Sequence, residues 1–589
     1  MTSPTQTSIR WRRLAFFLAT SATFLAMLGM MAYTLSPGGL DIIDCLMLAA
    51  FAITLPWSVI GFWNALIGLG LMIVSRRPEV IASPAAALGQ NNEPITERTA
   101  VLVCVRNEDP SRLRRNLENM LSGLATSGAA DKLHCFILSD SYKPDVVDTE
   151  ALLANELRRR YDGRLPQTYR RREMNTGYKA GNIRDFCERW GSGFDHMVVL
   201  DADSFMSTQA ILRLIRIMQA DTKLGIVQSL VVGMPSTSPF ARIFQFGMRL
   251  GMRSFTLGSA FWQADCGPYW GHNAIIRVKP FMEQCDMPLV GGKHVLSHDQ
   301  VEAALMRRAG YEVRVLPIED GSWEENPPTL LEFMRRDLRW CEGNMQYWRL
   351  LTLPGLHGLS RFQLVFAILM YIGSPAWMAF ALLASTRHVL IETPGPVFRP
   401  DTGSLLLIFV LTMTFAPKLA TVFDVLIHSA ARRSFGGSIR FVFNLLLDTL
   451  FTTILAPIMA VTHTVFIGGL CFGRTIGWPS QLRDEHAVSF ADAWNRLWLQ
   501  TWVGAMGISW FAKISVTTLL YSLPLVGSLA LAVPFAMVTA LPGLGLVLAR
   551  FGIARIPEET APPDALSDLK LAAVTAVSPA RPAVAGAVP

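Results

Sequence analysis

Long uncharged stretches alternate with one charged region along the chain. No charged residue occurs in residues 14–40, 45–75 or 362–386. Each of these stretches can supply the roughly 20 apolar residues that an α-helix needs to cross a bilayer. The pattern therefore predicts an N-terminal transmembrane hairpin over residues 1–77 and a second membrane region over residues 356–550.

The charged region between them, residues 99–355, alternates β-rich runs with helical patterns, after a Pro-, Ala- and Asn-rich linker at 78–98. Strands are expected near 99–105, 134–139, 197–200 and 225–232, and helices near 112–124, 145–160 and 208–219. This order predicts a mostly parallel sheet covered by helices. Ligands of such sheets bind beyond the carboxyl ends of the strands.

The second membrane region contains one ambiguous segment. Residues 449–473 are uncharged but include several threonines and His463, so they either span the membrane or lie along its surface. A loop near 474–500 is cytoplasmic only if they do not span. Lys418 lies inside another span, where it marks a polar path or reaches the membrane surface beside Asp424. The Pro- and Ala-rich tail, residues 551–589, is predicted to be disordered.

Composition supports membrane insertion and gives an orientation. The chain is 51% hydrophobic and only 17% charged, with a mean hydropathy of +0.33. Basic residues flank the first two spans on the side that faces the charged region, which predicts that this region is cytoplasmic. The net charge of +7 suits anionic lipids. Nucleic acid is not predicted as a partner, because the arginine clusters flank spans or lie among acids.

The eight cysteines show no Cys-x-x-Cys spacing. Most of them fall in the predicted cytoplasmic region. Free thiols in a reducing compartment are therefore expected, rather than zinc sites or disulfides.

Two aspartates follow the apolar run Met197-Val198-Val199-Leu200. Asp201 and Asp203 are alternate residues of an extended segment, so both carboxylates can face one ligand. Hard oxygen donors beside a diphosphate suit Mg²⁺ or Mn²⁺. An Asp-x-Asp motif is weak when taken by itself, but a purely structural role would leave two carboxylates desolvated.

Other candidate residues also lie at element ends. Asp140 ends a strand and either accepts hydrogen bonds from a uracil or ribose or caps a turn. Lys179 begins a helix, where it either binds a pyrophosphate or is simply solvated. Asp299 also begins a helix and is either a general base or a helix cap.

Arg336, Arg339 and Trp340 share one face of a predicted helix. The arginines suit a diphosphate and the indole suits the apolar face of a sugar. Ordinary packing is the alternative interpretation of this face.

Four motifs in order carry a resemblance to a known family: Tyr178-Lys179-Ala180-Gly181-Asn182, Asp201-Ala202-Asp203, Ser297-His298-Asp299 and Arg336-Asp337-Leu338-Arg339-Trp340. The set resembles processive family-2 glycosyltransferases of the cellulose-synthase type. Two positions depart from the cellulose synthases, since His298 replaces a glutamate and Arg336 replaces a glutamine. Both departures resemble the glucosyltransferase H family, which makes osmoregulated periplasmic glucans.

This resemblance implies a membrane-bound inverting glucosyltransferase with a cytoplasmic catalytic domain of GT-A type. It implies UDP-glucose as donor, Mg²⁺ or Mn²⁺ as cofactor, a growing glucan as acceptor, and a β-1,2-linked product. It further implies translocation of the product across the bacterial inner membrane, and a periplasmic glucan-processing protein as partner.

The resemblance also implies roles for individual residues. The donor would be bound by Asp140, Lys179, Asn182, Asp201, Arg336 and Arg339, and the metal by Asp203 with Asp201 beside it. Asp299 would be the base, and Trp340, Cys266 and Gly267 would lie on the acceptor side. A gating loop would contain Gln481, Arg483 and Asp484. Such a loop favours a non-spanning 449–473 segment and six spans with both termini cytoplasmic.

Three other functions remain open. A synthase of cellulose, chitin or hyaluronan type would share every catalytic residue. A nonprocessive transferase acting on a lipid-linked acceptor would need no long translocation path. A membrane transporter or binding module would perform no chemistry.

Overall fold

A seven-stranded sheet forms the centre of the charged region. The structure, a computed structural model, describes residues 6–390, 398–476 and 482–569 of the chain. The strand order is β3-β2-β1-β4-β8-β6-β9, and only β8 runs antiparallel to its neighbours. The predicted mostly parallel sheet is thereby confirmed. Its strands are β1 (Thr99–Val105), β2 (Leu133–Ser139), β3 (Gln167–Arg171), β4 (His196–Asp201), β6 (Leu224–Ser229), β8 (Ala274–Arg277) and β9 (Glu312–Leu316).

Helices cover both faces of this sheet because alternate strand residues point in opposite directions. Val101 and Val103 of β1 pack in one apolar cluster with α5 (Pro110–Ala125), α6 (Pro144–Arg160) and α8 (Thr208–Ala220). Ala100 and Leu102 pack in the other with α7 (Tyr178–Trp190), α10 (Val278–Gln284) and α11 (Asp299–Arg308). A second small sheet, β5 (Ser204–Met206), β10 (Ser322–Glu324) and β7 (Val232–Gly233), continues from the end of β4.

Two helices join the α/β domain to the membrane region, namely α9 (Pro239–Gln263) and α12 (Leu330–Gln346). The α9 helix crosses α2 (Ile42–Val74) at two glycines. A Cβ atom on Gly68 would lie 1.9 Å from the Ser254 carbonyl oxygen, and one on Gly258 would lie 2.0 Å from that of Asn64. The close crossing fixes the first hairpin against the α/β domain.

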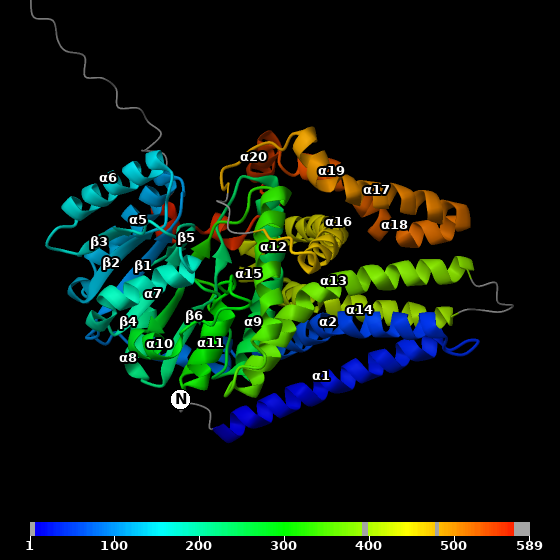
Figure 1. Ribbon diagram of the computed structural model, residues 1–589, viewed down its shortest axis with the longest axis horizontal. Helices are drawn as coiled ribbons and strands as arrows, with labels where there is room; N and C mark the ends of the chain where they lie inside the picture. Colours follow the sequence, from blue (N-terminus) through cyan, green and yellow to red (C-terminus); the bar gives the residue numbers. More distant parts are fainter. Residues whose placement is uncertain (1–5, 391–397, 477–481, 570–589) are drawn as a thin grey trace, which may run out of the picture.

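Five helices are long and apolar enough to cross a membrane, and a bent helix pair raises this number to six, within the described part of the chain. They are α1 (Gln6–Leu35), α2, α13 (Gly358–Leu390), α14 (Pro400–Ile427) and α16 (Ser438–Cys471), plus the pair α18 (Val516–Ala530) and α19 (Ala532–Val538). In Figure 1, α1, α2, α13, α14, α17 (Phe490–Ile514) and α18 extend away from the α/β domain. Two of these candidate spans, α1 and α2, lie within residues 1–77, where the sequence predicts a transmembrane hairpin.

The α16 helix contacts the domain side near both of its ends. Phe441, in its first turn, packs in one apolar cluster with Phe246 of α9. His463, two turns before its end, contacts Asp337 of α12. Figure 1 shows this helix nearly end-on, whereas α13 and α14 run across the view.

Lys418 forms its ion pair with a neighbouring helix and not beside Asp424. Its ammonium group lies 2.6 Å from Asp448 of α16, and it does not pair with Asp424. Asp424 instead binds Arg253 at 3.0 Å. The lysine therefore joins α14 to α16.

Two segments are more ordered than their composition predicted. The expected linker contains the short helices α3 (Pro78–Ala82) and α4 (Ala85–Leu88), whose alanines pack into the core. The expected disordered tail is wrong for residues 551–569. Within it, α21 (Pro557–Thr560) places Glu558 2.9 Å from Arg249, and Leu566 and Leu569 are buried against the α/β domain. Ion pairing and burial outweigh the Pro- and Ala-rich composition there.

Candidate active site

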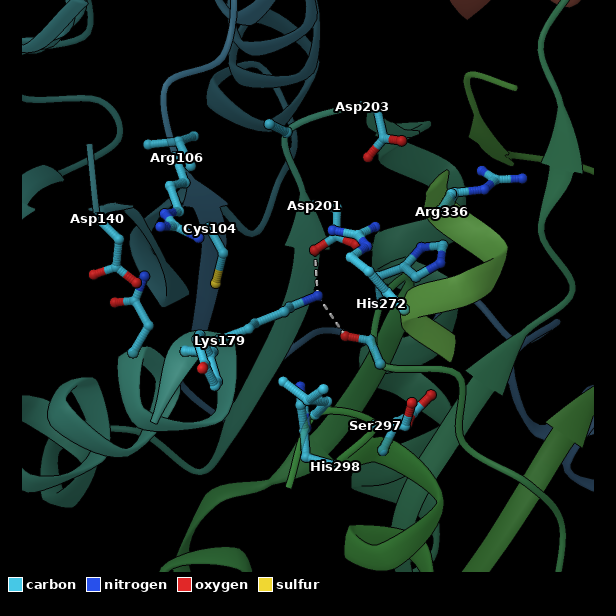
Figure 2. A pocket seen from close by; sticks show the side chains of 18 of the residues that line it. Cys104, Arg106, Asp140, Lys179, Asp201, Asp203, His272, Ser297, His298 and Arg336 are labelled. Carbon is cyan, nitrogen blue, oxygen red and sulfur yellow. Dashed lines mark hydrogen bonds and ion pairs between the residues drawn. The ribbon is translucent and has the colours of Figure 1, made fainter. Parts of the chain in front are cut away.

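A pocket at the carboxyl ends of β1, β2 and β4 gathers residues from segments far apart in the chain (Figure 2). Six of the residues lining it are Asp140, Lys179, Asp201, Asp203, Asp299 and Arg483. Helix α12 closes one side with Arg336, Arg339 and Trp340. The position agrees with the expectation that ligands bind beyond the ends of parallel strands.

Asp140 follows β2 and is held by an arginine that the sequence analysis missed. Nε and Nη2 of Arg172 each lie 2.7 Å from one oxygen of the Asp140 carboxylate. Arg172 also donates to the carbonyl of Tyr178, at the start of α7. The carboxylate is therefore fixed in orientation before any ligand binds. Only its position one residue after β3 hinted at Arg172.

Asp201 ends β4 and pairs with Lys179 of α7. Lys179 also donates to the Gly271 carbonyl at 2.7 Å (Figure 2). Burial opposes ionisation of Asp201, but Lys179 and His272 outweigh it and lower the pKa of this carboxyl to about 2. Gly177 adopts φ +72° just before α7, and glycine meets the demand of that left-handed turn.

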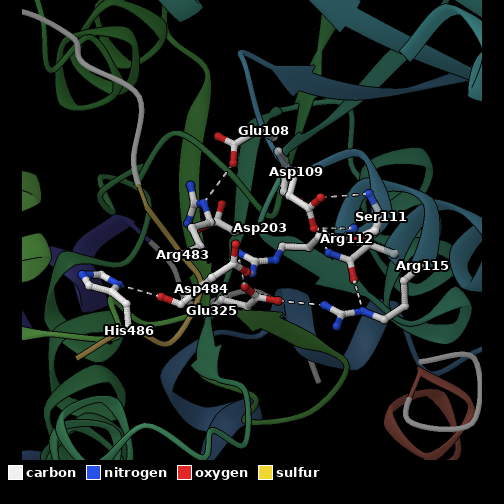
Figure 3. Close-up of polar contacts among 12 residues, drawn as sticks. Glu108, Asp109, Ser111, Arg112, Arg115, Asp203, Glu325, Arg483, Asp484 and His486 are labelled. Atoms are coloured by element: carbon white, nitrogen blue, oxygen red, sulfur yellow. Dashed lines mark hydrogen bonds and ion pairs between the residues drawn. The ribbon is translucent and has the colours of Figure 1, made fainter. Parts of the chain in front are cut away.

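Asp203 pairs with Arg483, a residue 280 positions later in the chain (Figure 3). Arg483 also lies 3.1 Å from Glu108, whose pKa burial raises. Asp484 does not line the pocket; its carboxylate lies 2.5 Å from Arg112 of α5. Together these three ion pairs hold the segment before α17 against the α/β domain.

Asp299 begins α11 in a different environment. Burial, with a contribution from Glu302, raises the pKa of Asp299, and the neighbouring His298 only partly opposes it. His298 in turn lies 3.0 Å from Glu302. Burial lowers the pKa of His298, but Glu302 outweighs that effect and the pKa is raised. A buried carboxyl with a raised pKa is suited to proton transfer.

Helix α12 contributes two buried arginines and one half-exposed tryptophan. The Arg336 guanidinium lies 4.8 Å from the centre of the Trp340 ring. Burial, together with the charges of Arg483 and Arg336, lowers the pKa of Arg339 to about 10. Three guanidinium groups so close together favour an anionic ligand.

Three other predicted residues lie elsewhere or serve the framework. The Asn182 amide lines the pocket but donates to the Leu138 carbonyl at 3.0 Å, which ties α7 to β2. Cys266 and Gly267 do not line the pocket, because they pair with Val313 of β9. Trp270, Gly271 and His272 of the following turn line it instead. Gln481 lies outside the described residues.

Asp201 and Asp203 are the residues that could hold a metal ion. The described residues contain no group of three or more His, Cys, Asp or Glu side chains arranged for a metal. A Mg²⁺ ion commonly takes only one or two protein carboxylates and completes its shell with substrate phosphates and water. The two aspartates fit an ion that arrives with a diphosphate, provided that Lys179 and Arg483 release them.

Two family models match the chain. Residues 100–284 match Glycosyl transferase family 2, and residues 196–418 match Glycosyl transferase family group 2. Together the two matches cover the α/β domain and the start of the second membrane region.

Curated relatives extend the similarity further along the chain. Glucans biosynthesis glucosyltransferase H of Dickeya dadantii is 36% identical over 537 residues, which is 88% of this chain and 62% of the relative. The protein of the same name from Escherichia coli is 36% identical over 88% of this chain and 63% of its own length. The chain thus spans less than two thirds of the length of these relatives.

Similarity to solved structures is weak. A mannosyltransferase from Pyrobaculum calidifontis in complex with GDP-Man and Mn²⁺ covers 62% of this chain and 99% of its own, at 14% identity and a TM-score of 0.38. These values are too low to support an argument.

Proposed function

We propose that this chain, which belongs to the family-2 glycosyltransferases, extends a β-1,2-glucan from UDP-glucose. Its relatives over most of its length are the glucans biosynthesis glucosyltransferases H. The observation that carries the proposal is the pocket itself. It brings an aspartate at each of two strand ends, an aspartate with a raised pKa and two buried arginines to one place. A nucleotide-sugar transferase requires these groups.

The donor would lie between the strand ends and α12. Asp140, oriented by Arg172, would accept hydrogen bonds from the uridine. Arg336 and Arg339 would neutralise the diphosphate, and the N-terminus of α7 would add backbone N–H groups. Burial lowers the pKa values of Arg336 and Arg339, because it disfavours their positive charge. An anionic ligand between them would offset that cost.

Asp299 would act as the general base. It would take the proton from the acceptor hydroxyl as the hydroxyl oxygen bonds to C1 of glucose and the bond from C1 to the diphosphate breaks. Attack on the face opposite the leaving group inverts the anomeric centre. Trp340, 43% exposed at the edge of the pocket, would stack against the acceptor sugar.

Asp203 and Asp201 would hold Mg²⁺ or Mn²⁺. A divalent ion there would stabilise the negative charge that builds on the departing diphosphate. Arg483 and Lys179 neutralise the same carboxylates in its place.

The test is synthesis by purified protein in nanodiscs supplied with radiolabelled UDP-glucose and Mg²⁺ or Mn²⁺. We expect a β-1,2-linked polymer, which Asp299→Asn abolishes and Asp286→Asn leaves intact. Asp286 is a suitable control because its side chain is 77% exposed and lies outside the pocket. A β-1,4 product would assign the chain to another polymer, single-sugar lipids would indicate a nonprocessive enzyme, and no transfer would favour a transporter or binding module.

We further propose that six helices, α1, α2, α13, α14, α17 and α18, cross the bacterial inner membrane. In this topology α17 spans although it is not among the candidate spans, and α16, which is among them, lies along the cytoplasmic surface. The contacts of α16 with α9 and α12 near its two ends support this topology. It leaves the domain in the cytoplasm and gives the glucan a route to the periplasm, where a glucan-processing protein would receive it.

Cysteine labelling tests the topology. A membrane-impermeant maleimide applied to intact spheroplasts should not label Cys471, at the end of α16, but should label a Ser36→Cys variant between α1 and α2. Cys471 is exposed and becomes reactive after lysis in this arrangement. Labelling of Cys471 in intact spheroplasts would show that α16 spans the membrane.

A further inference from the structure

Helix α12 has two chemically different sides. Arg336, Arg339 and Trp340 line the pocket, but Asp337 does not. The carboxylate of Asp337 is turned toward the membrane helices, where it pairs with Nε2 of His463 on α16. The Tyr371 hydroxyl of α13 donates to the same carboxylate at 3.4 Å.

His463 is held from several directions. Its Nδ1 lies 3.0 Å from the Ser374 hydroxyl of α13. Its ring meets Tyr371 edge-on, with centroids 5.1 Å apart and an interplanar angle of 84°. The side chains of His463 and Asp337 are only 12% and 15% exposed. A pair that is buried and oriented by two neighbours, Tyr371 and Ser374, fixes geometry in a way that an exposed ion pair does not.

The α13 helix is weakened at this point. Pro375 lies inside the helix, directly after Ser374. A proline has no backbone N–H to donate to the carbonyl four residues earlier, which here belongs to Tyr371. The turn of α13 that carries Tyr371 and Ser374 therefore lacks one backbone hydrogen bond. The side-chain contacts of these two residues hold this turn in place.

A second contact joins the same helix to the segment after α16. The Glu342 carboxylate accepts a hydrogen bond of 2.8 Å from the backbone N–H of Ile476. Asp337 and Glu342 lie five residues apart on α12. The helix that carries the two pocket arginines is thus attached to the membrane region at two points.

We infer that Asp337 and His463 are a positioning pair that sets the placement of Arg336 and Arg339 in the donor pocket. The inference rests on the proposed function, in which these arginines bind the diphosphate. Asp337 and the arginines are adjacent on one rigid helix, so a displacement of α12 moves all of them together. The pair thereby links the position of α13 and α16 to the geometry of donor binding.

The test compares two ion pairs on α16. Asp337→Asn, His463→Gln and the double variant are assayed for KM and kcat with UDP-glucose in nanodiscs. Misplacement of substrate-binding groups by a fraction of an ångström gives a marked loss, so we expect KM to rise about tenfold in each single variant. The double variant should be no worse than either single one. Ser374→Ala should shift KM in the same direction by a smaller factor.

Lys418→Met and Asp448→Asn provide the matched control. This pair, 2.6 Å apart, also joins α16 to a neighbouring membrane helix but makes no contact with α12. A purely structural role for both pairs predicts lower thermal stability with unchanged KM in every variant. An unchanged KM in His463→Gln and Ser374→Ala, or an equal rise in the Lys418 variant, would overturn the inference.

Arg339→Ala separates failure of the inference from failure of the proposed function. If Arg339→Ala leaves KM for UDP-glucose unchanged, the donor role of α12 is wrong. If Arg339→Ala raises KM and the Asp337 and His463 variants do not, only the positioning role is wrong.

Discussion

Four aspartates line the pocket, and they fall into two groups. Asp140, Asp201 and Asp203 stand at strand ends, and each is paired with a cation supplied by the chain, namely Arg172, Lys179 and Arg483. Asp299 stands at the start of a helix and forms no ion pair with any described residue. The same side chain thus has a lowered pKa at Asp201 and a raised pKa at Asp299.

This contrast separates binding from proton transfer. A carboxylate that stays ionised can hold a metal ion or a ribose, whereas a carboxyl with a raised pKa accepts a proton more readily. The neighbours, rather than the residue type, assign the two roles.

Removal of the unpaired carboxylate should have the largest effect. A positioned general base contributes about 10²–10⁴-fold to rate, so Asp299→Asn should lower kcat by that factor. Binding of UDP-glucose should stay within about twofold, since the proposed donor contacts lie at the strand ends and on α12. UDP release and equilibrium binding measure the two quantities. Weaker donor binding with unchanged kcat would place Asp299 in the donor site instead.

Removal of a paired carboxylate should act on stability as well. Asp140→Ala leaves Arg172 buried without its bidentate partner, and breaking such a pair costs about 3 kcal/mol. Thermal unfolding of the purified variant should therefore begin at a lower temperature than for Asp299→Asn. The double variant Asp140→Ala/Arg172→Met should recover most of the loss, because no unpaired charge remains. Equal unfolding temperatures for Asp140→Ala and Asp299→Asn would contradict the division of the aspartates into a paired and an unpaired group.

The contrast should also be visible in pH dependence. The base must be deprotonated to work, so kcat/KM should fall about tenfold per pH unit below the raised pKa of Asp299. This acid limb should lie above the pKa near 3.9 of an ordinary aspartate. A raised folded-state pKa means that the folded protein binds more protons between the two values, so stability falls as pH rises through this interval. Asp299→Asn should remove that fall, which thermal melts at several pH values would show.

Arg483 gives a smaller effect. Its guanidinium forms an ion pair with Asp203, the carboxylate proposed to bind the metal, so the metal ion must compete with Arg483 for this carboxylate. Arg483→Gln should lower the Mg²⁺ or Mn²⁺ concentration for half-maximal activity about fivefold, equivalent to about 1 kcal/mol of released pairing. Arg112→Gln is the matched control, because it frees Asp484 without touching Asp203. A higher metal requirement in Arg483→Gln would show that Arg483 supports the metal site.

Local pattern predicted the elements whose signals are short in sequence. The β1 strand and the aspartates after β2 and β4 were found because apolar runs ending in polar residues mark strand ends. Local pattern does not predict the pairing partners. Arg172 carries no signal of its contact with Asp140, and Arg483 enters only through the resemblance, as part of a gating loop, without its contact with Asp203. These contacts join residues 32 and 280 positions apart. The folded tail was missed for the same reason: Glu558 becomes stabilising only next to Arg249.

Cys266 shows a different limit of local pattern, because the resemblance implies an acceptor-side role whereas the structure places this turn in the framework outside the pocket. Its thiol is buried 3.4 Å from the Ser360 hydroxyl, and the adjacent Gly267 N–H donates to Val313. Cys266→Ala should therefore change kcat and KM by less than about twofold, because its thiol lies outside the pocket that would hold the reacting atoms. His272→Ala, in the turn that does line the pocket, is the matched comparison and should have a larger effect because its imidazole lies among the pocket residues. A loss of acceptor affinity in Cys266→Ala would instead extend the acceptor site beyond the pocket, to the turn before Trp270.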